Sequence, residues 1–152
     1  MAKNTKPIPT LTVKHIGSPS FNLIQNNFTK ENGNVKFSVL NNLRFSVDNN
    51  IINLTLLVSY NHPDTDPFLM MEIENMFELT DLNKFVPPNQ DIIPTDMDIP
   101  ENILITIASV SFSHARAIMG QHIAGTFAQG IYLPIIDGRD FAKNIFGATK
   151  IK

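Results

Sequence analysis

The sequence predicts an α+β fold, in which a four-stranded antiparallel β-sheet is followed by a long and a short C-terminal helix. Two observations lead to this prediction. Apolar and polar residues alternate in four stretches between residues 11 and 79, which is typical of strands with one buried face. Beyond residue 100 the alternation gives way to a long apolar stretch, 103–125, whose only formal charge is Arg116. A run of strands followed by helices is typical of an α+β domain.

The four strands are expected at residues 11–24, 35–47, 52–60 and 68–79. Residues 17–20 interrupt the first strand with a turn-like sequence that indicates a kink or bulge. We also expect a bulge at Asn41 and Asn42 in the second strand. Turn-forming residues at 48–50 and 61–67 separate the later strands, so the predicted sheet is meander-like.

Both helices are expected after a long irregular connector at residues 80–100. Pro100 and Glu101 suit the first turn of the long helix, and Gly125 suits the position just beyond its end. Asp137 is placed to cap the short helix, which we expect to stop at Gly147. Residues 1–152 form a single domain in this reading, with a loose N-terminus at 1–9 and a short C-terminal tail at 147–152.

The apolar stretch 103–125 has almost none of the polar face that a surface helix of a monomer carries. We therefore expect this helix to be covered on most sides. The segment behind it, 126–136, is also apolar, although loops normally run through solvent. Charged residues make up only 17% of the sequence, so little of the surface is left to be charged. These features predict a protein that associates with itself and binds an apolar partner.

Composition argues against several other classes of protein. The formal net charge is -2 and no basic run is present, which argues against nucleic-acid binding. The absence of cysteine excludes a disulfide scaffold and thiolate chemistry. The N-terminus lacks the apolar stretch of a signal peptide, and we expect a cytoplasmic protein. Seven polar residues make membrane insertion of the apolar stretch unfavourable, namely Ser109, Ser111, Ser113, His114, Arg116, Gln121 and His122.

No metal site, cofactor or catalytic set is expected. Two acidic pairs could suggest calcium, Asp64 with Asp66 and Asp96 with Asp98, but neither continues into a calcium-binding loop. On a helix, His114 and His122 would lie two turns apart, about 12 Å along the axis, which is too far to share a metal. The sequence has no serine nucleophile motif, no glycine-rich phosphate loop and no suggestive carboxylate pair. We therefore expect a protein that is not an enzyme.

Three segments, taken in order, resemble the bacterial SecB family of export chaperones. Residues 68–79 resemble the fourth strand of that family, which is apolar and acidic. Ala115 and Arg116 lie within the long helix, as the Ala-Arg pair of the family does. The residues that follow are similar to the family's Gly-Thr-Phe-Pro-Gln…Leu-x-Pro connector, namely Gly125, Thr126, Phe127, Gln129, Leu133 and Pro134. The resemblance spans residues 11–146, but Ala128 replaces the connector proline and the acidic C-terminal tail is absent.

The resemblance implies a fold with both helices on one face of the sheet, and a homo-oligomer that is a dimer of dimers. It also implies that the apolar loop walls a groove whose floor is the sheet. Our candidates for this client-binding groove are Phe28, Phe37, Val39, Phe127, Ile131, Leu133 and Ile135. The alternative is that these side chains simply pack in the core. The nearly uncharged long helix should lie in a subunit interface, with Ile107, Val110, His114, Ala117 and Ile118 as candidates.

The function implied by the resemblance is that of a molecular chaperone, which binds unfolded or non-native polypeptides and is linked to protein export. Whether the SecA motor is a partner stays open, because the acidic tail and the strongly acidic surface of the family are missing. One alternative is a dedicated chaperone for a single client, such as an antitoxin. Another is an oligomeric scaffold that has kept the fold without chaperone activity.

Overall fold

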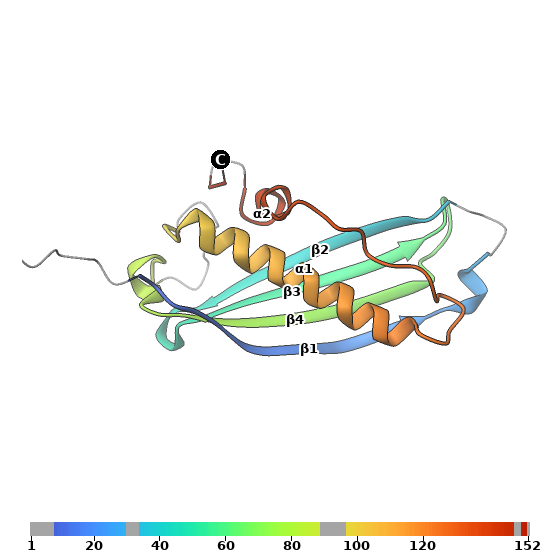
Figure 1. Cartoon of the computed structure of the whole chain (residues 1–152), viewed down its shortest axis with the longest axis horizontal. Coiled ribbons are helices and arrows are strands. Elements are labelled where there is room, and N and C mark those ends of the chain that lie inside the picture. The colour runs from blue at the N-terminus through green and yellow to red at the C-terminus, as the bar shows by residue number, and fades with distance from the viewer. Residues whose placement is uncertain (1–7, 30–33, 89–96, 148–149, 152) are drawn as a thin grey trace, which may run out of the picture.

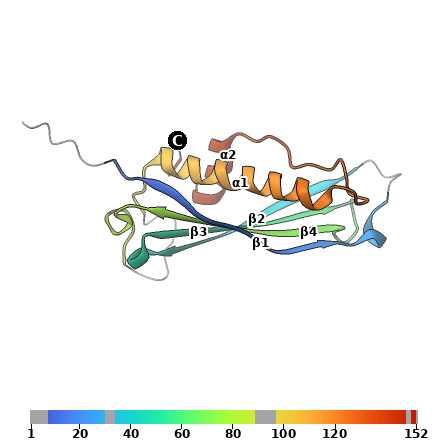
Figure 2. The same ribbon diagram turned by 60° about the horizontal axis from the view of Figure 1, so that its bottom comes forward.

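The computed structural model describes residues 8–29, 34–88, 97–147 and 150–151. The strands are β1 (Leu11–Leu23), β2 (Lys36–Ser46), β3 (Ile51–Asn61) and β4 (Leu69–Leu79), and the helices are α1 (Glu101–Ile123) and α2 (Gly138–Phe146). Short 3-10 turns lie at Gln25–Asn27, Val47–Asn49 and Leu82–Lys84. The strands form one antiparallel sheet, and both helices lie on the same face of it (Figure 1, Figure 2). The α+β fold class predicted from the sequence is confirmed.

The order of strands across the sheet is β1-β4-β3-β2, so the expectation of a meander-like sheet was wrong for β1. β2, β3 and β4 do form a meander, whereas β1 pairs with β4 and the segment after β1 crosses to the opposite edge. An ion pair of 3.6 Å between Lys14 and Glu78 joins the side chains of β1 and β4. Alternation of apolar residues defines the buried face of a strand but not its neighbours, which is why the sequence does not reveal this crossover.

The sheet has one face that α1 covers and one that neither helix covers (Figure 2). On β3 the even-numbered residues from Ile52 to Tyr60 are buried, and on β4 the odd-numbered residues from Leu69 to Leu79 are buried. The opposite face exposes three apolar side chains, Leu40, Leu57 and Met70. This strict alternation is the pattern expected for a sheet that packs on one side only.

One of the two predicted bulges is confirmed. The register of β1 shifts between Gly17 and Ser20, as expected, and shifts again between Val13 and His15. The bulge expected at Asn41 and Asn42 was wrong, because the pairing of β2 with β3 runs through these residues without a shift. A bulge would have moved the apolar residues that follow it from odd-numbered to even-numbered positions. Leu43 and Phe45 are instead odd-numbered, as Phe37 and Val39 are.

Helix α1 packs one face onto the sheet, with Ile103, Leu104, Ile107, Phe112 and Met119 among its buried residues. Its exposed residues are Asn102, Thr106, Ser113, Ala117, Gln121 and His122. Within one chain the helix is therefore not covered on most sides, and its polar face consists of small or uncharged side chains. By length and composition α1 could also cross a membrane, but nearly half of its most apolar window is buried within this chain, as in the core helix of a globular domain.

The ends of both helices follow the sequence signals. Gly125 adopts a left-handed φ of 74° just beyond α1. The Asp137 side chain caps α2 by accepting hydrogen bonds from the backbone N–H groups of Arg139 (2.8 Å) and Asp140 (3.2 Å). After α2, the side chain of Ile151 is fully buried and Lys150 donates a hydrogen bond to the carbonyl of Met97. The described part of the C-terminal tail therefore packs against the domain.

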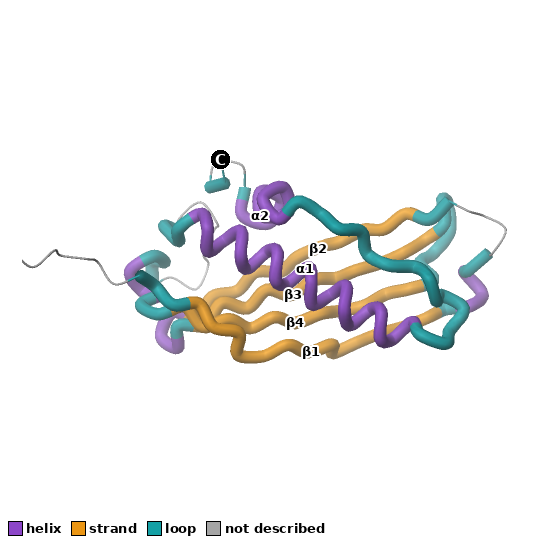
Figure 3. The backbone as a smooth tube through the Cα atoms, in the orientation of Figure 1, coloured by secondary structure: helices purple, strands orange, loops and turns teal. Residues whose placement is uncertain are grey.

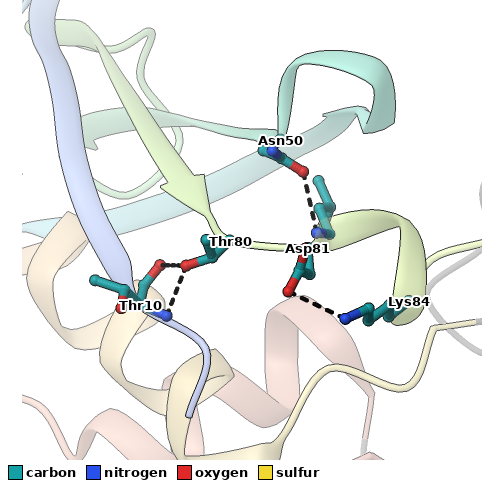
Figure 4. Close-up of polar contacts among 6 residues, drawn as sticks. Thr10, Asn50, Thr80, Asp81 and Lys84 are labelled. Carbon is teal, nitrogen blue, oxygen red and sulfur yellow. Dashed lines mark hydrogen bonds and ion pairs between the residues drawn. The ribbon is translucent and has the colours of Figure 1, made fainter. Parts of the chain in front are cut away.

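Polar contacts join the chain segments at one end of the sheet (Figure 4). The Thr80 hydroxyl accepts a hydrogen bond from the Thr10 N–H (2.8 Å) and donates one to the Thr10 carbonyl (3.0 Å). The Asn50 side chain accepts from the Leu82 N–H (3.1 Å), and Lys84 lies 3.2 Å from Asp81. These bonds fix the start of β1 beside the end of β4, at the end of the expected loose N-terminus, of which residues 1–7 lie outside the described residues.

Candidate functional site

The connector between α1 and α2 runs back beside α1 over the helix-covered face of the sheet (Figure 3). Its first part is a compact turn. The Thr126 hydroxyl donates to the Ile123 carbonyl (2.7 Å) and accepts from the Ala128 N–H (3.2 Å). The Gly125 N–H donates to the Gln129 side chain (3.1 Å). Ala128 is fully buried, so this turn is anchored in the core and holds Phe127 at a defined place.

Phe127 meets Phe28 from the β1–β2 crossover in a cluster of aromatic rings. The ring centroids of Phe28 and Phe127 are 5.1 Å apart. Phe28 also packs edge to face on the buried Phe68, at 5.0 Å, and lies 5.5 Å from the ring of His62. Such distances are typical of favourable aromatic pairs. Phe28 therefore links the core below it to the connector above it, and both Phe28 and Phe127 stay partly accessible to solvent.

An open cavity of about 680 Å³ lies over this aromatic pair. Its lining residues are Gln25, Phe28, Thr126, Phe127, Gln129, Gly130 and Tyr132. The structure thus brings together Phe28 and Phe127 from the residues predicted for the groove. It adds Gln25 and Tyr132, which the sequence analysis missed. We call these residues the aromatic groove.

Phe37 and Val39 do not line the aromatic groove. They belong to a second cavity, of about 540 Å³, between the edge strand β2 and helix α2. The other lining residues of this second cavity are Asn41, Phe112, Ile136, Asp137, Asp140, Phe141 and Asn144. Tyr60 lies between the two sites, since its ring is 5.8 Å from that of Phe37 and its hydroxyl donates to the Tyr132 carbonyl at 3.1 Å. Burial raises the pKa of Tyr60 to about 12, so this hydroxyl remains a neutral donor.

The remaining groove candidates in the connector differ sharply in exposure. Ile135 is 89% exposed, and its neighbour Tyr132 is 60% exposed. Ile131 is half-buried and packs against the core. Leu133 is only 2% exposed and belongs to the core, so the expectation that it is accessible to clients was wrong. In this stretch of connector Leu133 anchors the chain and Ile135 projects from it.

Arg116 contributes to the position of the connector. Its guanidinium lies 5.8 Å from the ring centroid of Phe112 and donates a hydrogen bond of 3.4 Å to the Pro134 carbonyl. A cation over an aromatic ring is a favourable contact. Arg116 therefore ties the middle of α1 to the connector just between Leu133 and Ile135.

The candidate residues for the oligomer interface also differ in how deeply they are buried. Ile107 is fully buried against the sheet of its own chain, so its assignment to a subunit interface was wrong. Val110 and Ile118 are half-buried, and Ala117 is exposed. His114 is partly buried, and its Nδ1 lies 2.8 Å from Oδ1 of the fully buried Asn75. The Asn75 amide group donates to the Leu54 carbonyl (3.2 Å), and Asn75 Oδ1 accepts a hydrogen bond from the His114 N–H. Burial lowers the pKa of His114.

The described residues contain no group of three or more histidine, cysteine, aspartate or glutamate side chains that could hold a metal ion. Asp64, Asp66 and Asp98 lie at exposed positions, and Asp96 lies outside the described residues. The arrangement offers aromatic and apolar surface with amide groups at its rim. Accessible apolar surface of this kind is typical of sites that bind a partner molecule.

No family model and no curated protein matches the chain. The fold is similar to that of the Mycobacterium tuberculosis SecB-like chaperone Rv1957, whose structure was solved in complex with a ChAD peptide from the antitoxin HigA1, Rv1956. The TM-score is 0.51 at 8% sequence identity, and the match covers 83% of this chain and 90% of that chain. At such low identity the likeness shows the fold alone.

Proposed function

We propose that this protein is a SecB-like molecular chaperone that binds unfolded polypeptides along the aromatic groove and the exposed part of the connector. The observation that carries the proposal is that Phe28 and Phe127 meet in an open cavity that the exposed Tyr132 also lines, with Ile135 exposed further along the same connector. Apolar surface that stays accessible on a folded domain is typical of sites that bind protein partners. The fold likeness to a SecB-like chaperone supports the same conclusion.

A client would bind through contacts that do not depend on a particular sequence. Aromatic and aliphatic side chains of the client would enter the groove, and the amides of Gln25 and Gln129 would pair with its backbone. The second cavity adjoins β2, an edge strand of the sheet. Such an edge can pair with an extended peptide, which would then place its side chains against Phe37 and Val39. Binding of this kind needs neither a cofactor nor a catalytic group.

The proposal includes assembly and location. The exposed side of α1 around Val110, His114, Ala117 and Ile118 would form the subunit interface of a dimer of dimers in the cytoplasm. A link to protein export follows from the SecB-like reading. We expect weak or no binding to the SecA motor, because the net charge is only -2.

A second candidate is a dedicated chaperone for one client. The observation that favours it is that the similar Rv1957 structure contains a peptide from an antitoxin. A scaffold that has kept only the fold is the third alternative. The three readings differ in how many unrelated unfolded proteins they allow this chain to bind.

The test is suppression of aggregation with three unrelated denatured clients, measured by light scattering. A general chaperone suppresses aggregation of all three, and the Phe127→Ala variant is weaker on each. The matched control is Leu40→Ser, which removes an apolar side chain that is 62% exposed on the opposite, uncovered face of the sheet. Suppression of a single client would favour the dedicated chaperone. No suppression, or equal loss in both variants, would refute the proposed site.

A further inference from the structure

His62 is the one buried histidine in the described part of the chain, with a side chain that is only 1% exposed. It begins the turn between β3 and β4. Its carbonyl accepts hydrogen bonds from the Thr65 N–H (3.2 Å) and the Thr65 hydroxyl (2.9 Å), so the backbone at His62 is fixed. A buried imidazole must have partners for both ring nitrogens, and these partners define its protonation.

Both ring nitrogens of His62 bond to the β1–β2 crossover. Nδ1 lies 2.9 Å from the Asn34 carbonyl oxygen, which can only accept, so Nδ1 carries a proton. Nε2 accepts a hydrogen bond of 3.0 Å from the Thr29 N–H, so Nε2 carries none. The two bonds together are compatible only with the neutral ring protonated at Nδ1. A second proton would place an N–H at Nε2 against the N–H of Thr29.

The bonds of His62 flank the aromatic groove. Thr29 directly follows Phe28, and the His62 ring lies 5.5 Å from Phe28 and 5.2 Å from Phe68. On the other side of Phe28, the Asn27 side chain donates to the Pro67 carbonyl at 3.0 Å. Phe28 is thus held between two hydrogen bonds to one turn.

We propose that His62 is the positioning residue of the aromatic groove. Its ring, bonded through both nitrogens to the β1–β2 crossover, holds Phe28 against Phe127, so that loss of these bonds weakens client binding. This inference rests on the proposed function, since it assigns a role within the same groove. The effect on clients is exerted through Phe28 and not by contact with His62 itself, which is buried.

The experiment is a double-mutant cycle on client affinity. The probe is reduced, carboxymethylated α-lactalbumin labelled with fluorescein, and binding is followed by anisotropy at about pH 8, where histidine side chains are normally neutral. We expect His62→Leu and Phe28→Ala each to weaken binding about threefold to tenfold, the range that the loss of one aromatic contact gives. The double variant should be no weaker than Phe28→Ala alone. Additive losses would overturn the inference.

Rescue by a conservative variant separates this role from a merely structural one. At the same pH, His62→Gln should bind the client more tightly than His62→Leu, because a Gln amide can donate to the Asn34 carbonyl and accept from the Thr29 N–H. The exposed His122→Gln should bind as wild type does. Equal affinities of His62→Gln and His62→Leu would refute the role of His62, whereas wild type that binds no client would refute the proposed function as well.

Discussion

Leu133 and Ile135 lie two residues apart in the connector, and the structure gives them opposite roles. Leu133 is buried, so Leu133→Ala should lower the free energy of unfolding by about 2–5 kcal/mol, the range for removing a large aliphatic side chain from a packed core. For a domain of this size that corresponds to a fall in melting temperature of roughly 10 °C. Ile135→Ala removes an exposed side chain and should change stability by less than about 0.5 kcal/mol.

For client affinity the expectation is reversed, so that Ile135→Ala should lose more than Leu133→Ala. The apolar contact that Ile135 makes with a client is worth about 1–2 kcal/mol, so Ile135→Ala should weaken binding about tenfold. Folded Leu133→Ala, kept below its melting temperature, should bind nearly as wild type does. The assay pairs thermal unfolding at fixed protein concentration with anisotropy of a labelled unfolded polypeptide. A wild-type melting temperature for Leu133→Ala, or wild-type affinity for Ile135→Ala, would refute the reasoning.

Three further predictions concern packing, protonation and assembly. Gly138→Ala should destabilise the protein by about 1–3 kcal/mol, because a Cβ there would lie 1.9 Å from the Ser109 hydroxyl, and Ser109→Gly in the same chain should restore much of the loss in urea unfolding. Burial lowers the pKa of His114 in the folded protein below its ordinary value of 6.5, so the associated stability is complete above pH 6.5 and is lost as the pH falls through the folded pKa. A titration of unfolding free energy should therefore be flatter for His114→Gln, and an identical slope would contradict this. Ala117→Arg should leave the fold intact, since Ala117 is exposed, but should reduce the mass found by sedimentation, and a wild-type protein that is already monomeric at micromolar concentration would rule out the interface.

Most of the fold could be predicted because each element carries a local signal. The alternation in β3 and β4, the cap at Asp137 and the left-handed Gly125 are all properties of a few neighbouring residues. The partner of β1 could not be predicted in this way, since pairing with β4 depends on contacts far apart in the sequence. The bulge expected at Asn41 failed because an exposed polar residue among the odd-numbered apolar residues of β2 was taken for a change of phase.

The candidate site could be predicted only in part. Phe28 and Phe127 are apolar residues in loops, and that unusual placement is visible in the sequence. Leu133 and Ile135 have the same pattern and the opposite exposure, which only the path of the connector determines. His62 gives no signal in the sequence, because its importance arises from hydrogen bonds to Thr29 and Asn34, which lie 33 and 28 residues away.

Site-specific photo-cross-linking tests the central claim most directly. A photoreactive amino acid replaces Ile135, which is 89% exposed in the connector that follows the aromatic groove, or Leu40, which is 62% exposed on the uncovered face of the sheet. Each variant is irradiated with the labelled unfolded polypeptide at equal concentration. The account predicts strong cross-linking from position 135, little from position 40, and loss of the position 135 signal when excess unlabelled client is added. Equal yields from both positions, or a higher yield from position 40, would contradict it.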